Sequence, residues 1–511
     1  MSNPLDLARR TGYPTLEGQL DVRVSSDPAT AKLRGVYELL EDTDAEIAGT
    51  LAHLQRLEAR RKDLLIDLNS IASFMLNLPA ELICEIFLHC LPPLCTPPSP
   101  RDAPLLLAQV CRHWRSMALS LPALWTHICV PVALKAVGSR VEMPSAVLDL
   151  WLERAGPCLL SVSVVLETQA PPPETTQVWW PSNEAFRTLC HNCHRWRELE
   201  IVRRLEDFPL FLPKETHWNL PELAKLTLLL AYGGRHPSGY PPGVLSNLMN
   251  TPALREVHLM GFTPISLQLP WAQLTTAHVE NLLPIEFLET LAHTTHLVDG
   301  TFSLWPTQMF HIPATAPAVR LLRLKSLRII GELCTEIMTY LACPALARFA
   351  LSFGPGNDLA PLTAFLARSP SIVDLDLDAR AAVPLGGLLG VLDALPTTEA
   401  LALGVHTGLL NTMLPHVLRS TPTLLPRLRR LVVRERVDRY NEPPVDAADV
   451  VDMLRTRWAA GLKSFCLVTT HVFHTIHPGF SILAREGMDL ELKTHGSGPF
   501  LVVYFNSRRQ Y

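Results

Sequence analysis

Apolar residues and prolines recur in one short phrase through most of the chain. The phrase runs proline, any residue, apolar, two residues, apolar, one residue, apolar. Clear copies occur as PELAKLTL at 221–228 and at 252–259, 317–324, 344–351, 370–377 and 426–433, with a weaker copy at 396–403. Copies without the proline occur at 195–201 and 461–467, and degenerate ones at 269–279 and 296–302. The two closing apolar positions lie two residues apart, as in a strand with one buried face.

The spacing of these copies predicts a solenoid. The middle apolar position falls at 199, 226, 257, 277, 300, 322, 349, 375, 401, 431 and 465. Steps of this size overlap the range of leucine-rich repeats. The segments between copies have helical spacing at 286–296, 334–343, 359–369, 386–395 and 446–461. We therefore expect an α/β fold in which residues 131–495 form a degenerate leucine-rich-repeat-like solenoid with a curved parallel sheet. The alternative is an ordinary α/β domain with leucine-rich strands.

A different period marks residues 31–74, which contain no proline. Apolar residues alternate there by steps of three and four from Leu33 to Leu68, and Asp44, Glu58 and Arg61 interrupt the series. An acidic segment, EDTDAE at 41–46, precedes a basic segment, RLEARRK at 56–62. The pattern predicts one long helix, either amphipathic and packed on the next domain or paired as a coiled coil. Residues 1–30 before it and 496–511 at the other end are expected to be flexible tails.

Residues 75–130 have a third pattern, with a short apolar helix between a Leu-Pro pair and a Pro-Pro pair. A proline-rich stretch at 91–104 cannot continue the helix, because proline lacks the backbone donor. Helical spacing then resumes at 105–121. So small a group of helices cannot cover all its apolar surface, and we expect a partner to cover the rest.

This segment resembles an F-box, a small trihelical module. The resemblance rests on Leu78-Pro79, Glu81-Leu82 and Ile86-Phe87, and on the later run VCRHWR at 110–115 with Trp125. The whole layout is similar to that of the fungal F-box proteins with C-terminal leucine-rich repeats. The resemblance implies that the box binds a Skp-type adaptor and, through it, a cullin–RING ubiquitin ligase. The adaptor-binding residues it implies are Leu78, Pro79, Leu82, Ile86, Val110, Cys111 and Trp114. The wide proline-rich insert departs from a compact box and either loops out or weakens docking.

Composition narrows the class of protein further. The 511 residues are 48% hydrophobic and 18% charged, with a net charge of −4, which does not indicate a nucleic-acid binder. The start of the chain has no signal-peptide pattern, and no apolar run is long enough to span a membrane. Eleven irregularly spaced cysteines are expected to be reduced and mostly buried. We therefore expect a cytoplasmic or nuclear protein.

Candidate chemistry is sparse. CHNCH at 190–194 has one Cys-x-x-Cys pair, but a structural zinc site usually takes four ligands from two such pairs. The sequence has no G-x-S-x-G elbow, no phosphate-binding loop and no H-E-x-x-H. DLDLD at 374–378 sets three carboxylates on one strand face, and we expect them to be solvated rather than to bind a cation. The sequence thus predicts no enzyme, no catalytic residue, no metal and no cofactor.

Together these patterns predict the substrate-receptor subunit of a Skp–cullin–F-box ubiquitin ligase. The box would hold the adaptor and the repeats would bind a protein substrate. The alternative is a leucine-rich-repeat interaction scaffold whose box-like helices only cap the solenoid. A cap would bury Leu78, Leu82 and Trp114, whereas a docking module would leave part of this set exposed. The long helix 31–74 is expected to self-associate weakly or not at all.

Overall fold

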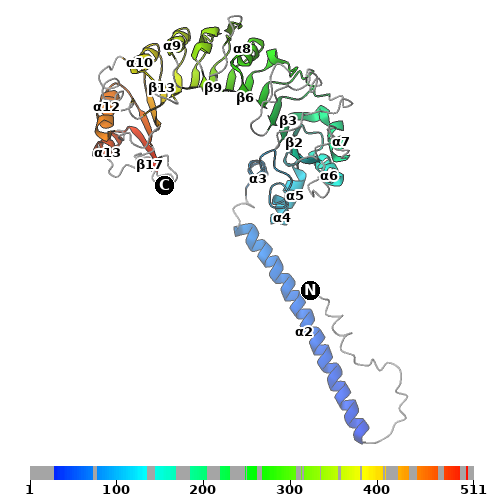
Figure 1. Ribbon diagram of the computed structural model, residues 1–511. Coiled ribbons are helices and arrows are strands. Elements are labelled where there is room, and N and C mark those ends of the chain that lie inside the picture. Colours follow the sequence, from blue (N-terminus) through cyan, green and yellow to red (C-terminus); the bar gives the residue numbers. More distant parts are fainter. Residues whose placement is uncertain are drawn as a thin grey trace. The chain divides into compact units, whose positions relative to one another are not determined.

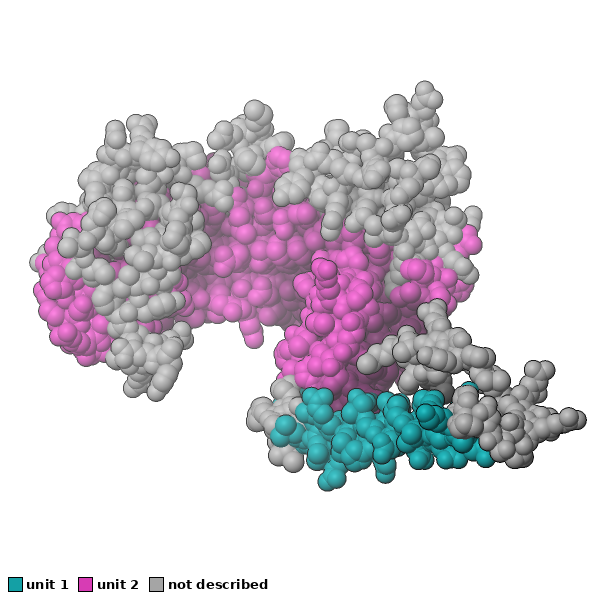
Figure 2. Space-filling model, turned by 90° about the horizontal axis from the view of Figure 1, so that it is seen from below, with its two compact units in different colours: residues 1–83 teal, residues 84–511 magenta. Residues whose placement is uncertain are grey.

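The structure is a computed structural model that divides into two compact units, residues 1–83 and 84–511 (Figure 2). It describes residues 28–72, 78–134, 144–168, 184–203, 219–230, 248, 250–261, 267–305, 312, 316–333, 335–354, 358–379, 383–406, 409, 424–436, 446–469, 477–494 and 502–504. The tails expected at 1–30 and 496–511 therefore lie mostly outside the described residues.

The first unit contains one continuous helix of 45 residues, α2 (Pro28–Ala72). Within it, Thr43 and Thr50 donate hydrogen bonds from their hydroxyls to the carbonyls of Leu39 and Glu46 four residues earlier. The apolar seam is open to solvent along its length, from Tyr37 at 49% to Leu68 at 59% exposed. The helix therefore has an unpaired apolar stripe in this unit.

The second unit is built on one long sheet of 15 strands that follow one another in chain order, with β8 and β10 outside it. All neighbouring strands are parallel until the last pair, which is antiparallel. Within this unit the strands curve into an arc and line its inner side (Figure 1). The strands are β1 (His127–Leu134), β2 (Leu160–Thr168), β3 (Trp196–Arg203), β4 (Lys225–Leu230), β5 (Glu256–Met260), β6 (Thr276–Leu282), β7 (Asp299–Leu304), β9 (Ser326–Leu333), β11 (Arg348–Phe353), β12 (Asp374–Ala379), β13 (Ala400–His406), β14 (Arg430–Arg436), β15 (Ser464–Thr469), β16 (Asp489–Thr494) and β17 (Val502–Tyr504).

The expected mixed α/β class with a long parallel, leucine-rich-repeat-like sheet is confirmed. The middle apolar residues of successive copies are direct partners, for example Leu199, Leu226 and Val257. All three are buried, because alternate strand residues face the helical side of the sheet. Middle position 300 is a glycine because the ring of Phe302 fills its space, and a Cβ there would lie 2.7 Å from that ring.

The copy at 317–324 is misplaced in the sequence prediction. Its middle residue, Leu322, is 62% exposed, and the strand begins at Ser326 instead. Leu327 occupies the middle position, paired with Gly300 on one side and Phe349 on the other. Val319, the first apolar position of this copy, and Arg320 form β8 (Val319–Arg320), which pairs with β10 (Leu341–Ala342) in a separate small sheet.

Helices cover the outer side of the arc (Figure 1). They are α6 (Ser145–Ala155), α7 (Glu184–His191), α8 (Pro284–His293), α9 (Ala360–Ala367), α10 (Leu385–Asp393), α12 (Ala447–Ala459) and α13 (Pro478–Arg485), with single 3₁₀ turns η3 (Cys193–Arg195), η6 (Trp271–Gln273) and η7 (Thr335–Tyr340). The helix expected at 334–343 is only the turn η7, because Leu341 and Ala342 pair with β8 and leave the helical path.

The box-like helices lead directly into the sheet. They are α3 (Ala80–His89), α4 (Leu107–Val110), α5 (Arg112–Ser120) and the turn η2 (Pro122–Trp125). The buried ring of Trp125 contacts Trp151 of α6 edge-on at 4.9 Å, and its Nε1 donates to the Ala118 carbonyl at 2.9 Å. The sheet begins at His127, two residues after Trp125. The domain boundary expected between residues 130 and 131 therefore falls inside β1.

Two further strands precede the first copy recognised in the sequence. Ile128 of β1 pairs with Val162 of β2, which pairs with Leu199 of β3, so all three occupy the middle position. At the other end, Leu490 of β16 continues the same row after Phe465. The repeat array is thus longer at both ends than the recurring phrase.

Candidate functional site

The concave face of the sheet is made by the strand residues that alternate with the buried ones. Because the strands are parallel and in register, these residues form rows that cross the sheet. One row runs through Glu200, Thr227, His258, His278 and Thr301 on β3 to β7. The inner surface of such an arc is where repeat proteins bind other proteins.

Carboxylates predominate in the N-terminal part of this face. Glu198, Glu256 and Asp299 lie around a hollow of about 450 Å³ that spans β3 to β7. Lys225 forms an ion pair with Glu256, with an Nζ–Oε1 distance of 2.8 Å, and that hydrogen bond is the main reason why the pKa of Lys225 is raised. Leu94 of the proline-rich insert also lines the hollow. The insert therefore does not simply loop out, because one of its side chains forms part of the concave surface.

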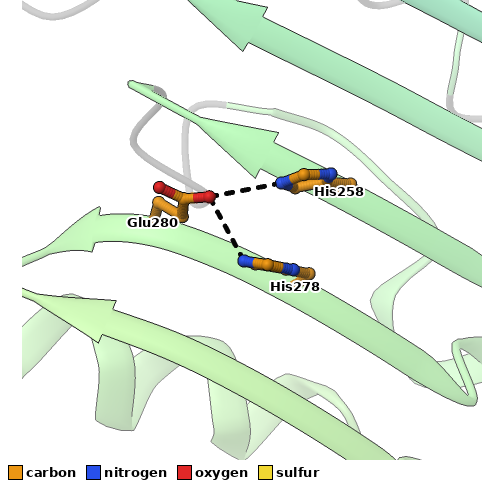
Figure 3. Close-up of side chains that lie close together, drawn as sticks. All are labelled: His258, His278 and Glu280. Atoms are coloured by element: carbon orange, nitrogen blue, oxygen red, sulfur yellow. Dashed lines mark hydrogen bonds and ion pairs between the residues drawn. The ribbon is translucent and has the colours of Figure 1, made fainter. Parts of the chain in front are cut away.

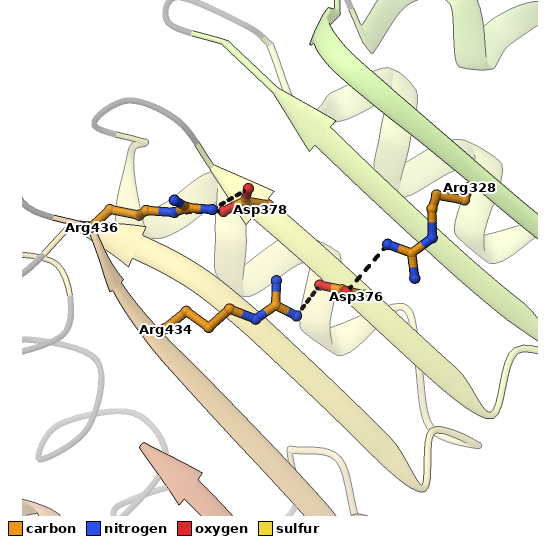
Figure 4. A network of polar contacts seen from close by, with 5 residues as sticks. All are labelled: Arg328, Asp376, Asp378, Arg434 and Arg436. Atoms are coloured by element: carbon orange, nitrogen blue, oxygen red, sulfur yellow. Dashed lines mark hydrogen bonds and ion pairs between the residues drawn. The ribbon is translucent and has the colours of Figure 1, made fainter. Parts of the chain in front are cut away.

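Arginines predominate further along the face, from β9 to β14 (Figure 4). Asp376 of β12 accepts a hydrogen bond from Arg434 Nη2 of β14 at 2.8 Å, and Arg328 Nη1 of β9 lies 4.0 Å from its other oxygen. Asp378 binds Arg436 through two hydrogen bonds, at 3.0 Å from Nε and 2.6 Å from Nη2. Asp376 is thus bridged to arginines on both sides of β12, and Asp378 to an arginine of β14.

Small residues on β13 make these bridges possible. In the register, Ala402 lies between Asp376 of β12 and Val432 of β14. Gly404 lies between Asp378 and Arg434 in the same way. A Cβ on Gly404 would collide with Oδ1 of Asp378, whose carboxylate lies over the glycine on its way to Arg436. Because its side chains here are small, β13 forms the low floor of a second hollow, of about 510 Å³, which Arg328 also lines.

The expectation of solvated carboxylates at 374–378 is therefore wrong for two of the three. The side chains of Asp376 and Asp378 are only 22% and 16% exposed, and both are paired with arginines. Asp374 is exposed, as expected. The paired carboxylates favour a role in orienting arginines rather than in binding a cation.

The F-box-like residues on α3 divide between two faces of the helix. Ile83 and Phe87, one turn apart, are buried at 1% and 0% exposed. Leu82 and Ile86, also one turn apart, are exposed at 52% and 38%. Pro79 before the helix is exposed, as suits a residue preceding the first turn. α3 therefore has an apolar inner face and a second apolar face that is open.

The remaining F-box-like residues differ in their surroundings. Val110 at the end of α4 is 55% exposed. Cys111 is the N-cap of α5, and its Sγ accepts a hydrogen bond from the Trp114 backbone N–H at 3.4 Å. The Trp114 ring is half-buried and contacts Phe87 edge-on, with the ring centroids 5.0 Å apart. Leu78 is partly exposed as well. Leu82 is thus mainly exposed, while Leu78 and Trp114 are only partly so.

The CHNCH motif is not assembled as a site. Cys193 is buried and directs its thiol to the Asn219 carbonyl at 3.4 Å, and burial raises its pKa. His191 at the end of α7 is exposed and bonds the Arg187 carbonyl through Nδ1. His194 is exposed as well. Among the residues that the structure describes, the one group of three side chains positioned to share a metal ion is His258, His278 and Glu280.

The cysteines are less buried than expected. None of the ten described cysteines forms a disulfide, and Cys129, Cys193 and Cys343 are buried, while Cys90 is exposed. The described part of the chain contains no helix with the length and apolar character needed to cross a bilayer.

The sequence prediction missed the histidine cluster and the arginine partners of β12. His258 and His278 each follow a middle apolar residue, Val257 and Ala277. Superposing the copies on that position places the two histidines in the same slot of consecutive repeats, which is the signal that could have revealed them. The aspartate–arginine pairs span 58 residues and leave no local signal.

Comparison with known proteins identifies no family for this chain. No protein-family model matches the chain, and no curated protein matches it. A search of solved structures gives 27 matching chains. One is from the crystal structure of the mouse RP105/MD-1 complex, with 14% identity and a TM-score of 0.26 over 68% of this chain. The match spans 57% of that chain, so this protein corresponds to only part of its length.

Proposed function

We propose that this protein is the substrate-receptor subunit of a Skp–cullin–F-box ubiquitin ligase. In this proposal the box-like segment 75–130 binds a Skp-type adaptor, and the concave face of the repeat sheet binds a protein substrate. The chain would do no chemistry itself, and it would act by raising the local concentration of substrate lysines beside an enzyme carried by other subunits.

The observation that carries the adaptor half is the exposure of apolar side chains at F-box positions. Leu82 and Val110 are each more than half exposed, at 52% and 55%. Leaving large apolar side chains open on a folded protein is typical of an interaction surface. The same helices contain a packed centre, with Phe87 fully buried against Trp114. This combination supports a docking module, because a simple cap would bury Leu82.

The observation that supports substrate binding is the separation of charge on the concave face. Four carboxylates and one lysine line the hollow of β3 to β7, whereas four arginines and three aspartates line the second hollow. A protein segment with basic residues at one end and acidic residues at the other would complement this face. Binding should weaken with added salt, because these charges are partly exposed.

Co-purification of the full chain with a Skp-type adaptor tests the first half. We expect the wild-type chain to retain the adaptor and the double variant Leu82→Ala, Ile86→Ala to bind it at least about tenfold more weakly, since truncating an interface anchor typically costs more than 1 kcal/mol. The matched control is Leu150→Ala, Ile482→Ala, which removes exposed apolar side chains from the outer helices α6 and α13. Equal retention by both double variants would contradict the proposed docking face.

Affinity purification with mass spectrometry tests both halves at once, because it reports adaptor and substrate together. We expect Arg328→Glu, Arg430→Glu to lose a captured protein while the adaptor remains. Arg485→Glu on α13 is the control, since it reverses an exposed charge away from the sheet. Capture of a concave-face partner without any adaptor would instead support the alternative of a scaffold with no ligase role.

A further inference from the structure

Two histidines and a glutamate meet on the floor of the concave face. His258 of β5 and His278 of β6 are direct partners in the parallel register, and Glu280 follows two residues later on the same face. The imidazole rings stack with centroids 4.1 Å apart and planes 23° from parallel. Both Nε2 atoms point to Glu280 Oε1, at 3.4 Å from His258 and 3.2 Å from His278 (Figure 3). The sheet backbone thus fixes the relative positions of all three side chains.

We propose that His258, His278 and Glu280 bind one divalent transition-metal ion of the zinc class. Zinc binds imidazole nitrogen and carboxylate oxygen at about 2.0–2.2 Å, and in a tetrahedron this sets adjacent ligand atoms roughly 3.3–3.6 Å apart. The two nitrogen–oxygen distances are close to this edge. The stacked rings would turn about their side-chain torsions, so that the lone pairs of both Nε2 atoms point at the ion. The mixed nitrogen and oxygen donors favour zinc-class ions over magnesium or calcium, which select oxygen ligands.

The charge around the cluster favours a cation. Glu198, Glu200, Glu256 and Asp299 line the same hollow, together with a single lysine, Lys225. This excess of carboxylates makes this part of the face attractive to cations.

The site is open on one side. The three side chains are 30%, 40% and 30% exposed, in the order His258, His278 and Glu280. The two histidines line the hollow of about 450 Å³, together with Thr227 and Thr301. Three protein ligands would leave at least one coordination position of the ion for water or a ligand from the hollow. The ligase proposal does not require this ion, so the two proposals succeed or fail separately.

Zinc titration of the metal-stripped full chain tests the proposal, with a chromophoric chelator as competitor. We expect one equivalent to bind at neutral pH. In His258→Gln, His278→Gln and Glu280→Gln the affinity should fall by more than about 100-fold, beyond the loss typical of an outer-shell partner. His194→Gln is the control, since it removes an exposed histidine from the CHNCH motif. This site would correct the sequence-based expectation of no metal.

Cobalt(II) as a spectroscopic probe identifies the ligand type. We expect visible absorption bands of a nitrogen- and oxygen-ligated ion, without the near-ultraviolet charge-transfer band that a thiolate ligand gives. Circular dichroism of each variant confirms that it is folded, which is expected because all three side chains are partly exposed. The proposal is overturned by absence of zinc binding in the wild-type chain, by a thiolate band, or by equal affinity in the folded His278→Gln variant.

Discussion

Two leucines five residues apart give a direct test of the repeat register around β9. Leu327 is 1% exposed and occupies the middle position between Gly300 and Phe349. Leu322 is 62% exposed and occupies the position that the recurring sequence phrase would assign to the core. Leu327→Ala and Leu322→Ala therefore make the same chemical change in the same repeat. The structure predicts that Leu327→Ala is the more destabilising, whereas the recurring sequence phrase predicts that Leu322→Ala is.

The expected magnitudes differ widely. Truncating a buried leucine to alanine typically costs about 2–5 kcal/mol, because it removes apolar contacts and leaves a cavity. We expect Leu327→Ala to fall in this range. A substitution at an exposed position away from special contacts usually changes stability by less than about 0.5 kcal/mol, which is the expectation for Leu322→Ala.

Native-state hydrogen exchange with mass spectrometry is the suitable assay. A repeat array need not unfold in one step, so a single melting temperature would average over several repeats. Exchange in peptides that cover β9 and β11 reports the free energy of local opening. Protection there should fall by roughly 30-fold or more in Leu327→Ala, since each 1.4 kcal/mol is about a factor of ten. A larger loss in Leu322→Ala than in Leu327→Ala would refute the register described here.

Further outcomes are expected at three places in the chain. Gly404→Ala should cost about 1–3 kcal/mol by overpacking, because the new Cβ displaces the Asp378 carboxylate from Arg436, and chemical denaturation would measure this. Cys466 should react slowly with iodoacetamide at pH 8, because burial, followed by Glu491, raises its pKa to about 11 and leaves roughly one thiolate in a thousand. Glu491→Gln should lower that pKa and speed the reaction, measured by mass spectrometry. The long helix α2 should associate weakly and only at low salt, if at all, because antiparallel pairing places its acidic segment against its basic one. Light scattering of the full chain would show this.

The glycine and cysteine outcomes have matched controls, and the outcome for α2 has a result that would contradict it. Gly390→Ala in helix α10 meets only Thr363 Oγ1, at 4.0 Å, and should be neutral or stabilising, since alanine favours helix. Equal effects at the two glycines would contradict the role given to the low floor of β13. Exposed Cys90 should react faster than Cys466 in the same sample. For α2, a tight dimer that persists at high salt would mean that the apolar seam, with Leu51 and Leu54 in it, dominates the charges.

Much of the repeat architecture was predictable, because each strand carries its own local pattern. Leu226 and Leu228, for example, alternate with polar residues and are fully buried. The error at 317–324 arose because the local apolar spacing fits two registers, with Leu321 and Leu324 both buried on the way into β9. The backbone decides between them, since Lys325 N–H bonds the Val298 carbonyl of the preceding repeat at 2.8 Å.

The candidate sites depend on side chains that the sequence keeps far apart. Asp378 and Arg436 are 58 residues distant, and only the intervening Gly404 shows why they meet. The histidine cluster likewise requires that β5 and β6 pair without offset, which no single copy of the phrase specifies. The split of α3 into a buried and an exposed apolar face is also invisible in composition, because Leu82 and Ile83 are both large apolar residues.

The strict chain order of the sheet has a consequence for synthesis on the ribosome. Every strand from β2 to β16 in the long sheet pairs with the strand of that sheet translated just before it. Each new repeat therefore finds its template already formed, and no strand waits for a partner from the far end of the chain. Contacts between residues close in sequence favour rapid folding. We expect the array to be completed one repeat at a time as it leaves the exit tunnel, with only its growing edge exposed at any moment.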